Sequence, residues 1–539
     1  MIRSITVLRR EAPALRLGAA LRTLAVGLAA RRLALLVTLA LVLLLTLHHQ
    51  PYYPATWFDE GLVLQGAINL VRFGQYAMRS AEGFRVLDQP LIANGPGIVL
   101  PISGAFALLG IGLFQARLIV AVYTVLAAAA FFAVAKRTFG PAAAWTALAL
   151  LLAIPQEGFL FFGRQVLGNV PALFYFLAGY LLWLKALARG GIPQAVGAGL
   201  LFGLAVITKN QYGLLLFALL VTWLTDRLSH RQMKTKTIVT VFATATACLV
   251  AWYGLQLALV GWEHFGSHLR AVTSSSRVTV FAFRPMRLRG SLWYLLRSGL
   301  PLFGIPGLAW GLWACKRRGP DSQRQWLLLV FALVWLAWYL LASVGWHRYA
   351  FEFYAVSALL TGKFVVDAVS FLRTSASRLT GRSQTFLRRV TLLLIGAITA
   401  GSALGLTLHV RDIAAAPDTA AHEFARRLQA HVAADAVVES WEWQLDVLAP
   451  LTYHHPTNDW VDKMTAALQF GDKLEEAYDL SAHQPDYLID GPFSKWTGLY
   501  ARPLADGCCT LVLSVGPYDL YQVGVPGGTE TTLGGKDGR

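Results

Sequence analysis

Long apolar runs recur along most of the chain and alternate with short segments rich in arginine and lysine. The runs lie at 33–47, 114–135, 142–158, 170–186, 194–209, 211–225, 237–260, 293–314, 325–344, 350–371 and 390–409. Most have about the length that an α-helix needs to cross a bilayer. Only 14% of the residues are charged, whereas soluble proteins carry about 25%. The sequence therefore predicts a mainly α, polytopic transmembrane helix bundle of about eleven spans, in which 194–225 is either two short helices or one helix broken at Lys209.

The basic segments between the runs indicate an orientation. Eleven spans place them all on one side of the membrane: Lys136-Arg137, Lys185–Arg189, Arg227–Lys236, Lys316–Arg324 and Arg373–Arg389. Basic loops mark the cytoplasmic side, so the basic N-terminus, residues 1–32, is expected there too. We interpret the net charge of +17 as this topology signal and as contact with membrane lipids, not as nucleic-acid binding. The expected location is a bacterial-type inner (plasma) membrane.

Residues 412–539 differ from the rest because acids outnumber basic residues there. The pattern predicts a helix at Thr419–Val432 and short strands at 436–440, 486–490 and Cys509–Val515. We expect a small extracytoplasmic α/β domain at 412–525 and a flexible tail at 526–539. Cys508 and Cys509 are adjacent, and no disulfide between them is expected.

The predicted membrane module, residues 33–411, has a long first external loop, 49–113, with two candidate interfacial helices, Gly61–Phe73 and Pro96–Leu109. Asp59 and Glu60 begin the first of them, directly after Trp57-Phe58. A carboxylate at the membrane surface is costly unless it is paired, solvated or functional. Asp59 could be a general base for an acceptor hydroxyl, and it could also cap the helix.

Several cations are expected at the same external face. Arg117, Arg164, Lys209 and Arg348 lie at predicted span ends, where a lone cation often only reaches toward the headgroups. A group of them is better explained by an anion such as a lipid phosphate, for which arginine offers two parallel hydrogen bonds. The loop 261–292 adds further basic residues, among them Arg270 and Arg289, and the pair His264 and His268 at i, i+4 spacing. That pair could hold a metal, but no metal site and no required cofactor are expected.

The motifs together resemble a known family. Their order along the chain is Trp57-Phe-Asp-Glu60, Asn94-Gly-Pro-Gly-Ile98, Ala116-Arg-Leu118, Phe162-Gly-Arg-Gln165 with Asn169-Val-Pro171, Gly203 to Lys209, and His347-Arg-Tyr349. This order is similar to that of polyprenyl-phosphate-sugar-dependent glycosyltransferases with the GT-C fold. It resembles glycosyltransferase family 39, the protein O-mannosyltransferase-like and aminoarabinose-transferase-like group, over residues 33–370. The chain departs from the family where relatives often have acids, at Gln165 and Asn169.

The resemblance implies an inverting transfer of a sugar from polyprenyl phosphate, such as undecaprenyl phosphate, to a hydroxyl of a lipid, glycan or protein. Asp59 would be the catalytic base and Glu60 would shape the acceptor site. The donor phosphate would be bound by Arg117, Arg164, Lys209, Arg348 and Tyr349. Possible acceptor or lipid contacts are Gln165, Asn169, His264, His268, Arg270, Arg289 and His347.

Two other functions stay open from the sequence alone. A transporter of lipids or lipid-linked sugars would place ionisable residues near the bilayer midplane in broken helices, and Lys209 is the best candidate for such a residue. A polymerase or ligase of lipid-linked glycans would use the basic loop 261–292 for a pyrophosphate donor.

Overall fold

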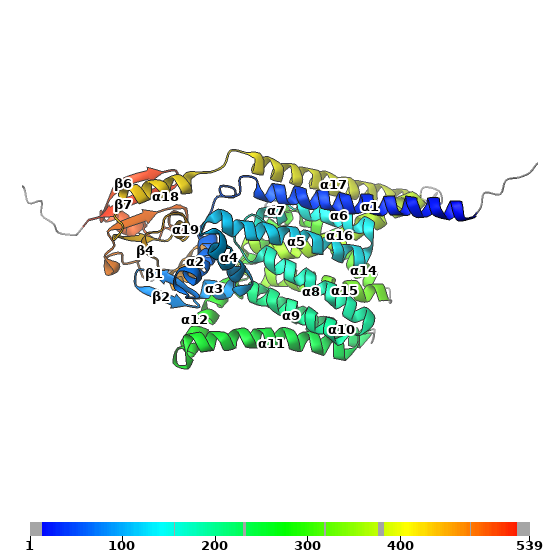
Figure 1. The fold of residues 1–539 in the computed structure, drawn as a ribbon, viewed down its shortest axis with the longest axis horizontal. Helices are drawn as coiled ribbons and strands as arrows, with labels where there is room; N and C mark the ends of the chain where they lie inside the picture. Colours follow the sequence, from blue (N-terminus) through cyan, green and yellow to red (C-terminus); the bar gives the residue numbers. More distant parts are fainter. Residues whose placement is uncertain are drawn as a thin grey trace, which may run out of the picture.

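The computed structural model describes residues 13–155, 157–229, 233–316, 320–375, 382–474 and 476–524. The predicted tail, 526–539, and the first twelve residues of the predicted basic N-terminus lie outside these ranges. Within them the chain forms a bundle of long helices with a C-terminal domain at one end (Figure 1). Shorter elements of the first loop, together with helix α12 (Trp262–Thr279), lie between the two.

The helices of the bundle follow the apolar runs. They are α1 (Pro13–Leu47), α5 (Leu113–Phe139), α6 (Pro141–Ala153), α8 (Asn169–Arg189), α9 (Ile192–Thr208), α10 (Gly213–Ser229), α11 (Thr235–Val260), α14 (Ile305–Lys316), α15 (Pro320–Leu341), α16 (Phe351–Ser375) and α17 (Arg382–Ala414). Within the described ranges, seven helices are long and apolar enough to cross a membrane, and α6 and α9 are among the shorter apolar ones. The positions of the predicted runs are confirmed, while their number as spans stays a prediction.

Two of the predicted runs are broken in ways that their residues explain. The run 293–314 divides into α13 (Arg287–Arg297), a π-helical turn at Leu300–Gly304 and α14. Gly299 lies between the first two with φ of 103°, a conformation that only glycine adopts at low cost. The region 194–225 is two helices, α9 and α10, joined by a short turn at Asn210–Tyr212.

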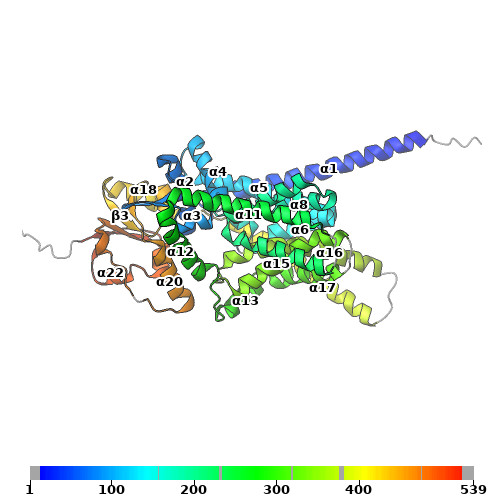
Figure 2. The same cartoon turned by 90° about the horizontal axis from the view of Figure 1, so that it is seen from below.

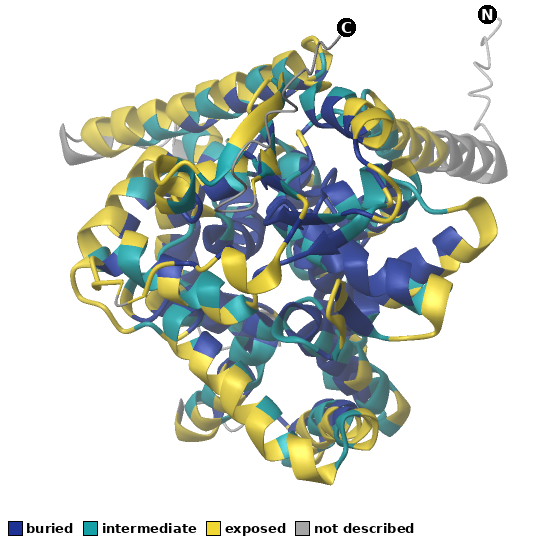
Figure 3. Ribbon diagram, turned by 90° about the vertical axis from the view of Figure 1, so that its left-hand side faces the viewer, coloured by how far each residue is buried: buried dark blue, intermediate teal, exposed yellow. Residues whose placement is uncertain are grey.

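The outer helices of the bundle keep their apolar side chains exposed. Only 11% of the apolar window is buried in α1 and in α17, against 61% in α5 and α8. Leu36 and Leu393 are 64% and 74% exposed. Figure 3, viewed from the domain end, shows a buried centre and an exposed periphery. Such large apolar surfaces are typical of helices that face lipid, which agrees with a multi-pass membrane protein.

The first loop is folded against the bundle and the C-terminal domain. It contains α2 (Phe58–Phe73), the hairpin β1 (Ala77–Ser80) and β2 (Gly83–Val86), α3 (Gln89–Ala93) and α4 (Pro96–Leu109). Helix α2 ends at Gly74, whose φ is 68°. Buried residues cover most of the circumference of α2, and its location at the membrane interface stays a prediction.

The C-terminal domain is α/β, as predicted. Its elements are α18 (Ala420–His431), β3 (Val437–Ser440), α19 (Leu445–Leu448), β4 (Thr452–His454), α20 (Asn458–Phe470), β5 (Tyr487–Asp490), α21 (Pro492–Thr497), α22 (Ala501–Ala505), β6 (Cys509–Val515) and β7 (Tyr518–Val523). The sheet order is β4-β3-β5-β7-β6; β3 is parallel to β4 and β5, and β7 is antiparallel to β5 and β6. Contrary to expectation, Cys508 and Cys509 form a disulfide.

The domain meets the first loop at two close contacts. The hairpin is joined to β4 because the Ala81 amide donates to the Tyr453 carbonyl at 2.7 Å. Gly61 of α2 lies directly against the backbone of Trp443, where a Cβ atom would come within 2.2 Å of the carbonyl carbon. No side chain fits between α2 and the domain at that point, so the two are packed backbone to backbone.

Candidate active site

Helix α2 carries Glu60 into the protein interior. Both Glu60 and Arg117 of α5 have fully buried side chains. Arg117 donates to the two carboxylate oxygens at 3.0 and 2.5 Å and to the Gln50 carbonyl at 2.6 Å, and the Val166 amide donates to Glu60 at 2.7 Å. Every strong partner of this carboxylate is therefore supplied by the protein, and the pair joins α2, α5 and the segment before α8.

The neighbouring carboxylate, Asp59, lies on the other side of α2. It forms an ion pair with Arg348, and both side chains are 17% exposed. The Arg348 guanidinium lies over the rings of Trp346 at 4.3 Å and of Trp57 and Tyr349 at 5.6 Å. Helix α2 begins at Phe58 and Trp57 provides no side-chain cap, so Asp59 is in the first helical turn and not at the capping position.

Two cavities open at this ion pair, and Phe58, Asp59, Trp346, Arg348 and Val461 line both of them. The first, here called the polar cavity, has a volume of about 90 Å³ and is also lined by Gln89, Asn94, Lys209, Asn210, Gln211, Ser275, Tyr349, Asn458 and Asp462. The second, here called the aromatic cavity, has a volume of about 330 Å³ and is also lined by Trp57, Glu157, Arg287, His347, Gln469, Phe493 and Trp496. Asp59 can therefore reach a molecule in either cavity.

A buried network supports one wall of the polar cavity. Lys209 follows the end of α9, is only 5% exposed and donates to Asn94 Oδ1 at 3.4 Å. Asn94 Oδ1 also accepts from the Gly168 amide at 3.2 Å. On α16, Glu352 accepts from Asn169 Nδ2 at 2.9 Å. The ammonium group of Lys209 is thus fixed at the cavity wall as a point charge.

The C-terminal domain supplies the opposite wall of the polar cavity through α20. Asp462 accepts from Ser275 Oγ of α12 (Trp262–Thr279) at 2.9 Å, and its burial raises its pKa to about 6. Asn458 Nδ2, Asn210 Oδ1 and Gln211 Oε1 are buried without a hydrogen-bond partner among the described residues. Amide donors and acceptors of this kind suit a ligand with several hydroxyl groups, because each hydroxyl both donates and accepts.

The aromatic cavity has a different character. Trp496 of α21 is 53% exposed at its edge, while the ring of His347 stacks on Tyr294 at 3.7 Å. Glu157 is 3.9 Å from His347, and burial raises the pKa of Glu157 to about 7. Exposed aromatic faces beside a few polar groups are typical of sites that bind amphipathic molecules.

The structure groups only part of the predicted site. Five of the predicted residues line the two cavities and so lie close together: Asp59, Lys209, His347, Arg348 and Tyr349. Arg117 and Arg164 line neither. Arg164 is fully buried and donates to the carbonyls of Leu45, His48 and Tyr53. The donors of both arginines and the oxygens of Glu60 are occupied by contacts within the protein, so phosphate binding by the arginines and an acceptor contact of Glu60 stay predictions.

The remaining predicted contacts also lie outside the two cavities. Gln165 and Asn169 are buried in the bundle. His268 is hydrogen-bonded at 3.2 Å to Gln256 of α11, and His264, Arg270 and Arg289 are exposed. None of these four side chains lines either cavity. Arg287 of the loop 261–292 is the residue that reaches the aromatic cavity.

Sequence reasoning missed Glu352, Asn458 and Asp462 as members or supports of the site. Glu352 lies three residues after the recognised His347-Arg-Tyr349 motif, and an acid inside an apolar run is a signal that could have found it. Asn458, Asp462 and Trp496 belong to a domain whose sequence gives no sign of contact with the first loop. Their position follows from tertiary packing alone.

Comparison with known proteins adds to this geometry. The family described as dolichyl-phosphate-mannose-protein mannosyltransferase matches residues 89–253. Among solved structures, ArnT from Cupriavidus metallidurans bound to undecaprenyl phosphate is similar with a TM-score of 0.60 and 14% identity, over 91% of this chain and 97% of that one. The chain has the GT-C fold.

A second GT-C structure agrees with this assignment. The oligosaccharyltransferase AglB from Archaeoglobus fulgidus, in complex with an inhibitory peptide and a dolichol-phosphate, is similar with a TM-score of 0.51 and 14% identity, over 90% of this chain and 74% of that one. A search of the curated proteins finds no match. The GT-C likeness to ArnT extends over the bundle and the C-terminal domain together, because it covers nearly the whole of both chains.

Proposed function

We propose that this protein is an integral-membrane glycosyltransferase that moves a sugar from a polyprenyl-phosphate donor to a hydroxyl of a lipid, glycan or protein acceptor. The observation that carries the proposal is the Asp59–Arg348 pair in the wall shared by two cavities. A transfer reaction needs a base and a cation at the point where two substrates meet, and the pair supplies both. The GT-C fold and the match to a mannosyltransferase family support this reaction class.

The two cavities suit the two substrates. The donor would occupy the polar cavity, with its phosphate near Lys209 and Arg348 and its sugar hydroxyls near Asn458 and Asp462. The acceptor would enter by the aromatic cavity, where Trp496 offers a face for stacking. Asp59, in the wall of both cavities, then lies beside the acceptor hydroxyl where that hydroxyl approaches the anomeric carbon.

The bond changes follow from this arrangement. Asp59 accepts the proton of the acceptor hydroxyl while the oxygen of that hydroxyl forms a bond to the anomeric carbon. The bond between that carbon and the phosphate oxygen breaks, the electron pair remains on the phosphate, and the configuration inverts. Arg348 and Lys209 stabilise the charge that develops on the leaving phosphate, a contribution that often dominates catalysis.

The proposed orientation places the C-terminal domain and the cavities on the extracytoplasmic side of a bacterial-type inner membrane. It is supported by the basic segments of the sequence, whose positive charge is typical of the cytoplasmic side. Transport is disfavoured by the position of Lys209. The break there is a turn at the end of the bundle that carries the first loop, where the Gly95 amide donates to the Thr208 carbonyl at 3.1 Å, and it is not an interruption within a helix.

The first test compares wild type with Asp59→Asn, purified in nanodiscs. Radiolabelled polyprenyl-phosphate sugars are supplied with a membrane extract as acceptor, and release of free polyprenyl phosphate is followed. Wild type should release it only with the extract. Asp59→Asn should lower the rate by about 10²- to 10⁴-fold, the usual contribution of a general base, with an unchanged melting temperature.

The matched control is Glu263→Gln, which removes an exposed acid on α12 and should keep full activity. Full activity of Asp59→Asn would overturn the base assignment. Bound donor without release in the wild type would favour transport or a pyrophosphate-linked donor.

A further inference from the structure

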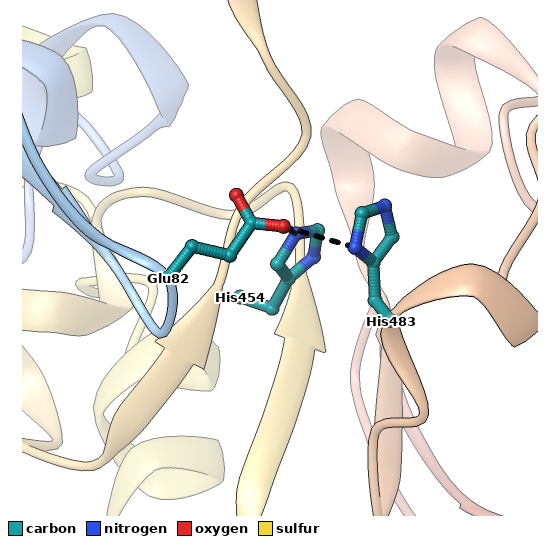
Figure 4. Close-up of side chains that lie close together, drawn as sticks. All are labelled: Glu82, His454 and His483. Atoms are coloured by element: carbon teal, nitrogen blue, oxygen red, sulfur yellow. Dashed lines mark ion pairs between the residues drawn. The ribbon is translucent and has the colours of Figure 1, made fainter.

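Three side chains from separate segments converge at the junction of the first loop and the C-terminal domain (Figure 4). Glu82 lies at the turn between β1 and β2, His454 ends β4, and His483 belongs to the short turn Ser481–His483. Glu82 Oε1 is 3.3 Å from His454 Nε2 and 3.1 Å from His483 Nδ1. The three candidate ligand atoms all lie within 4.8 Å of one another, and none of these residues lines the polar or the aromatic cavity.

The two distances from Glu82 Oε1 to the histidine nitrogens fit a small cation bound at this point. Zinc bonds nitrogen and carboxylate oxygen at about 2.0–2.2 Å in tetrahedral geometry. Two ligands of such a tetrahedron lie about 3.3 Å apart, by simple geometry from those bond lengths. The two distances around Glu82 Oε1 have this size.

A second carboxylate fixes the orientation of His454. Its Nδ1 is hydrogen-bonded to Glu439, a side chain with no exposed surface. Glu439 is itself held by the hydroxyls of Tyr478 at 2.6 Å and Tyr500 at 2.9 Å. With the proton on Nδ1, the lone pair of Nε2 points at Glu82. Metal-binding histidines are commonly held in this way by a carboxylate on the other ring nitrogen.

The charges of the cluster also call for a cation. Glu82 and Glu439 carry two negative charges, and His454 and His483 are stacked with ring centroids 3.8 Å apart. The nearby Arg85 faces Asp88, at 3.5 Å. A divalent ion would neutralise the two carboxylates and remove the repulsion between the lone pairs of Glu82 and His454.

We propose that Glu82, His454 and His483 bind one divalent transition-metal ion of the zinc class, which fastens the β1–β2 hairpin to the C-terminal domain. Two imidazoles and a carboxylate are ligands that zinc prefers, and the fourth position would be taken by water. The ion would reinforce the hydrogen bond between Ala81 and Tyr453. It would hold the domain over the cavities without taking part in the transfer.

The test uses the full-length protein in detergent, purified without a polyhistidine tag. The protein is treated with EDTA, incubated with zinc chloride and desalted, and bound zinc is measured by elemental analysis. Wild type should retain about one zinc per chain and gain several degrees in melting temperature, since an ion that binds the folded state stabilises it. Cobalt in place of zinc should give the intense visible absorption of a tetrahedral site.

His483→Ala and Glu82→Gln should lose the zinc, the cobalt spectrum and the gain in melting temperature. They are chosen because these side chains are 30% and 58% exposed, so their loss does not empty the core. His431→Ala, an exposed histidine of α18, is the control and should retain the ion. Equal zinc in wild type and His483→Ala, or none in wild type, would overturn the proposal and leave a hydrogen-bonded pair of protonated histidines in its place.

Discussion

The two sides of helix α2 place a carboxylate in different environments. On the side facing α5, Glu60 is fully enclosed and receives its hydrogen bonds from Arg117 and a backbone amide. On the other side, Asp59 pairs with Arg348, its one cationic partner among the described residues, and lies in the wall of two cavities. Adjacent residues of the same chemistry thus lie in two environments, and in the proposed function Glu60 serves the structure while Asp59 serves the reaction. A carboxylate whose partners are all fixed inside the protein positions the backbone, whereas one beside a cavity is available to a substrate.

The largest expected effect on stability comes from breaking the buried ion pair between Glu60 and Arg117. Glu60→Gln leaves the Arg117 charge buried without its partner, which typically costs about 3–5 kcal/mol. We expect a strongly lowered melting temperature and yield in detergent. The double variant Glu60→Gln/Arg117→Met should recover part of the loss. A variant with unchanged melting temperature and no activity would instead place Glu60 in the chemistry and remove the distinction between the two sides.

The variant Arg348→Lys tests the side of α2 that faces the cavities. Lysine keeps the charge but loses the planar fork and the packing between aromatic rings. We expect turnover to fall by about 10²-fold, as for the loss of one donor to a developing anion, with a melting temperature close to that of wild type. Single-turnover measurements with a saturating polyprenyl-phosphate donor would separate this effect from weaker binding. Wild-type turnover would show that Arg348 does not contact the leaving phosphate.

The smallest effect concerns Asp462, a cavity carboxylate that accepts a hydrogen bond from Ser275 and has no cation within ion-pair distance among the described residues. Burial raises its pKa to about 6, so the folded state binds a proton more tightly than the unfolded state. This group therefore lowers stability as the pH rises from about 4 to 6. Asp462→Asn should raise the melting temperature at pH 7.5 relative to wild type and change it less at pH 4.5. The same difference at both pH values would contradict the assignment.

Much of the fold could be predicted because a bilayer requires apolar helices of a certain length and basic loops on one side. Run length and loop charge located the bundle helices, and Pro96–Leu109 has the bounds expected for it. Asp59 was found because an acid after the first apolar run needs a reason. The Glu60–Arg117 pair could not be found in this way, since its members are 57 positions apart and nothing local links them.

The contacts that could not be predicted from the sequence depend on how separate segments pack. Arg117 and Arg164 were expected at a lipid phosphate because their position at span ends suggests exposure. Instead the loop after α1 folds over them and supplies backbone carbonyls. Strand β4 has three residues, and β7 is followed by glycine-rich sequence. The alternation of apolar and polar residues that predicts a strand is therefore weak in both. Asp462 reaches the site only because α20 packs on α12, a contact that the order of residues does not encode locally.

The contact at Gly61 has a practical consequence for exchanging domains between related enzymes. Since the backbone of α2 touches that of Trp443 with no side chain between them, a C-terminal domain from another protein would have to reproduce this surface to within a few tenths of an ångström. A chimera that exchanges residues 420–524 alone should assemble poorly. A chimera that also takes residues equivalent to 55–95 from that other protein would carry both sides of the contact between α2 and the domain. It should be the better starting point for changing which acceptor is used.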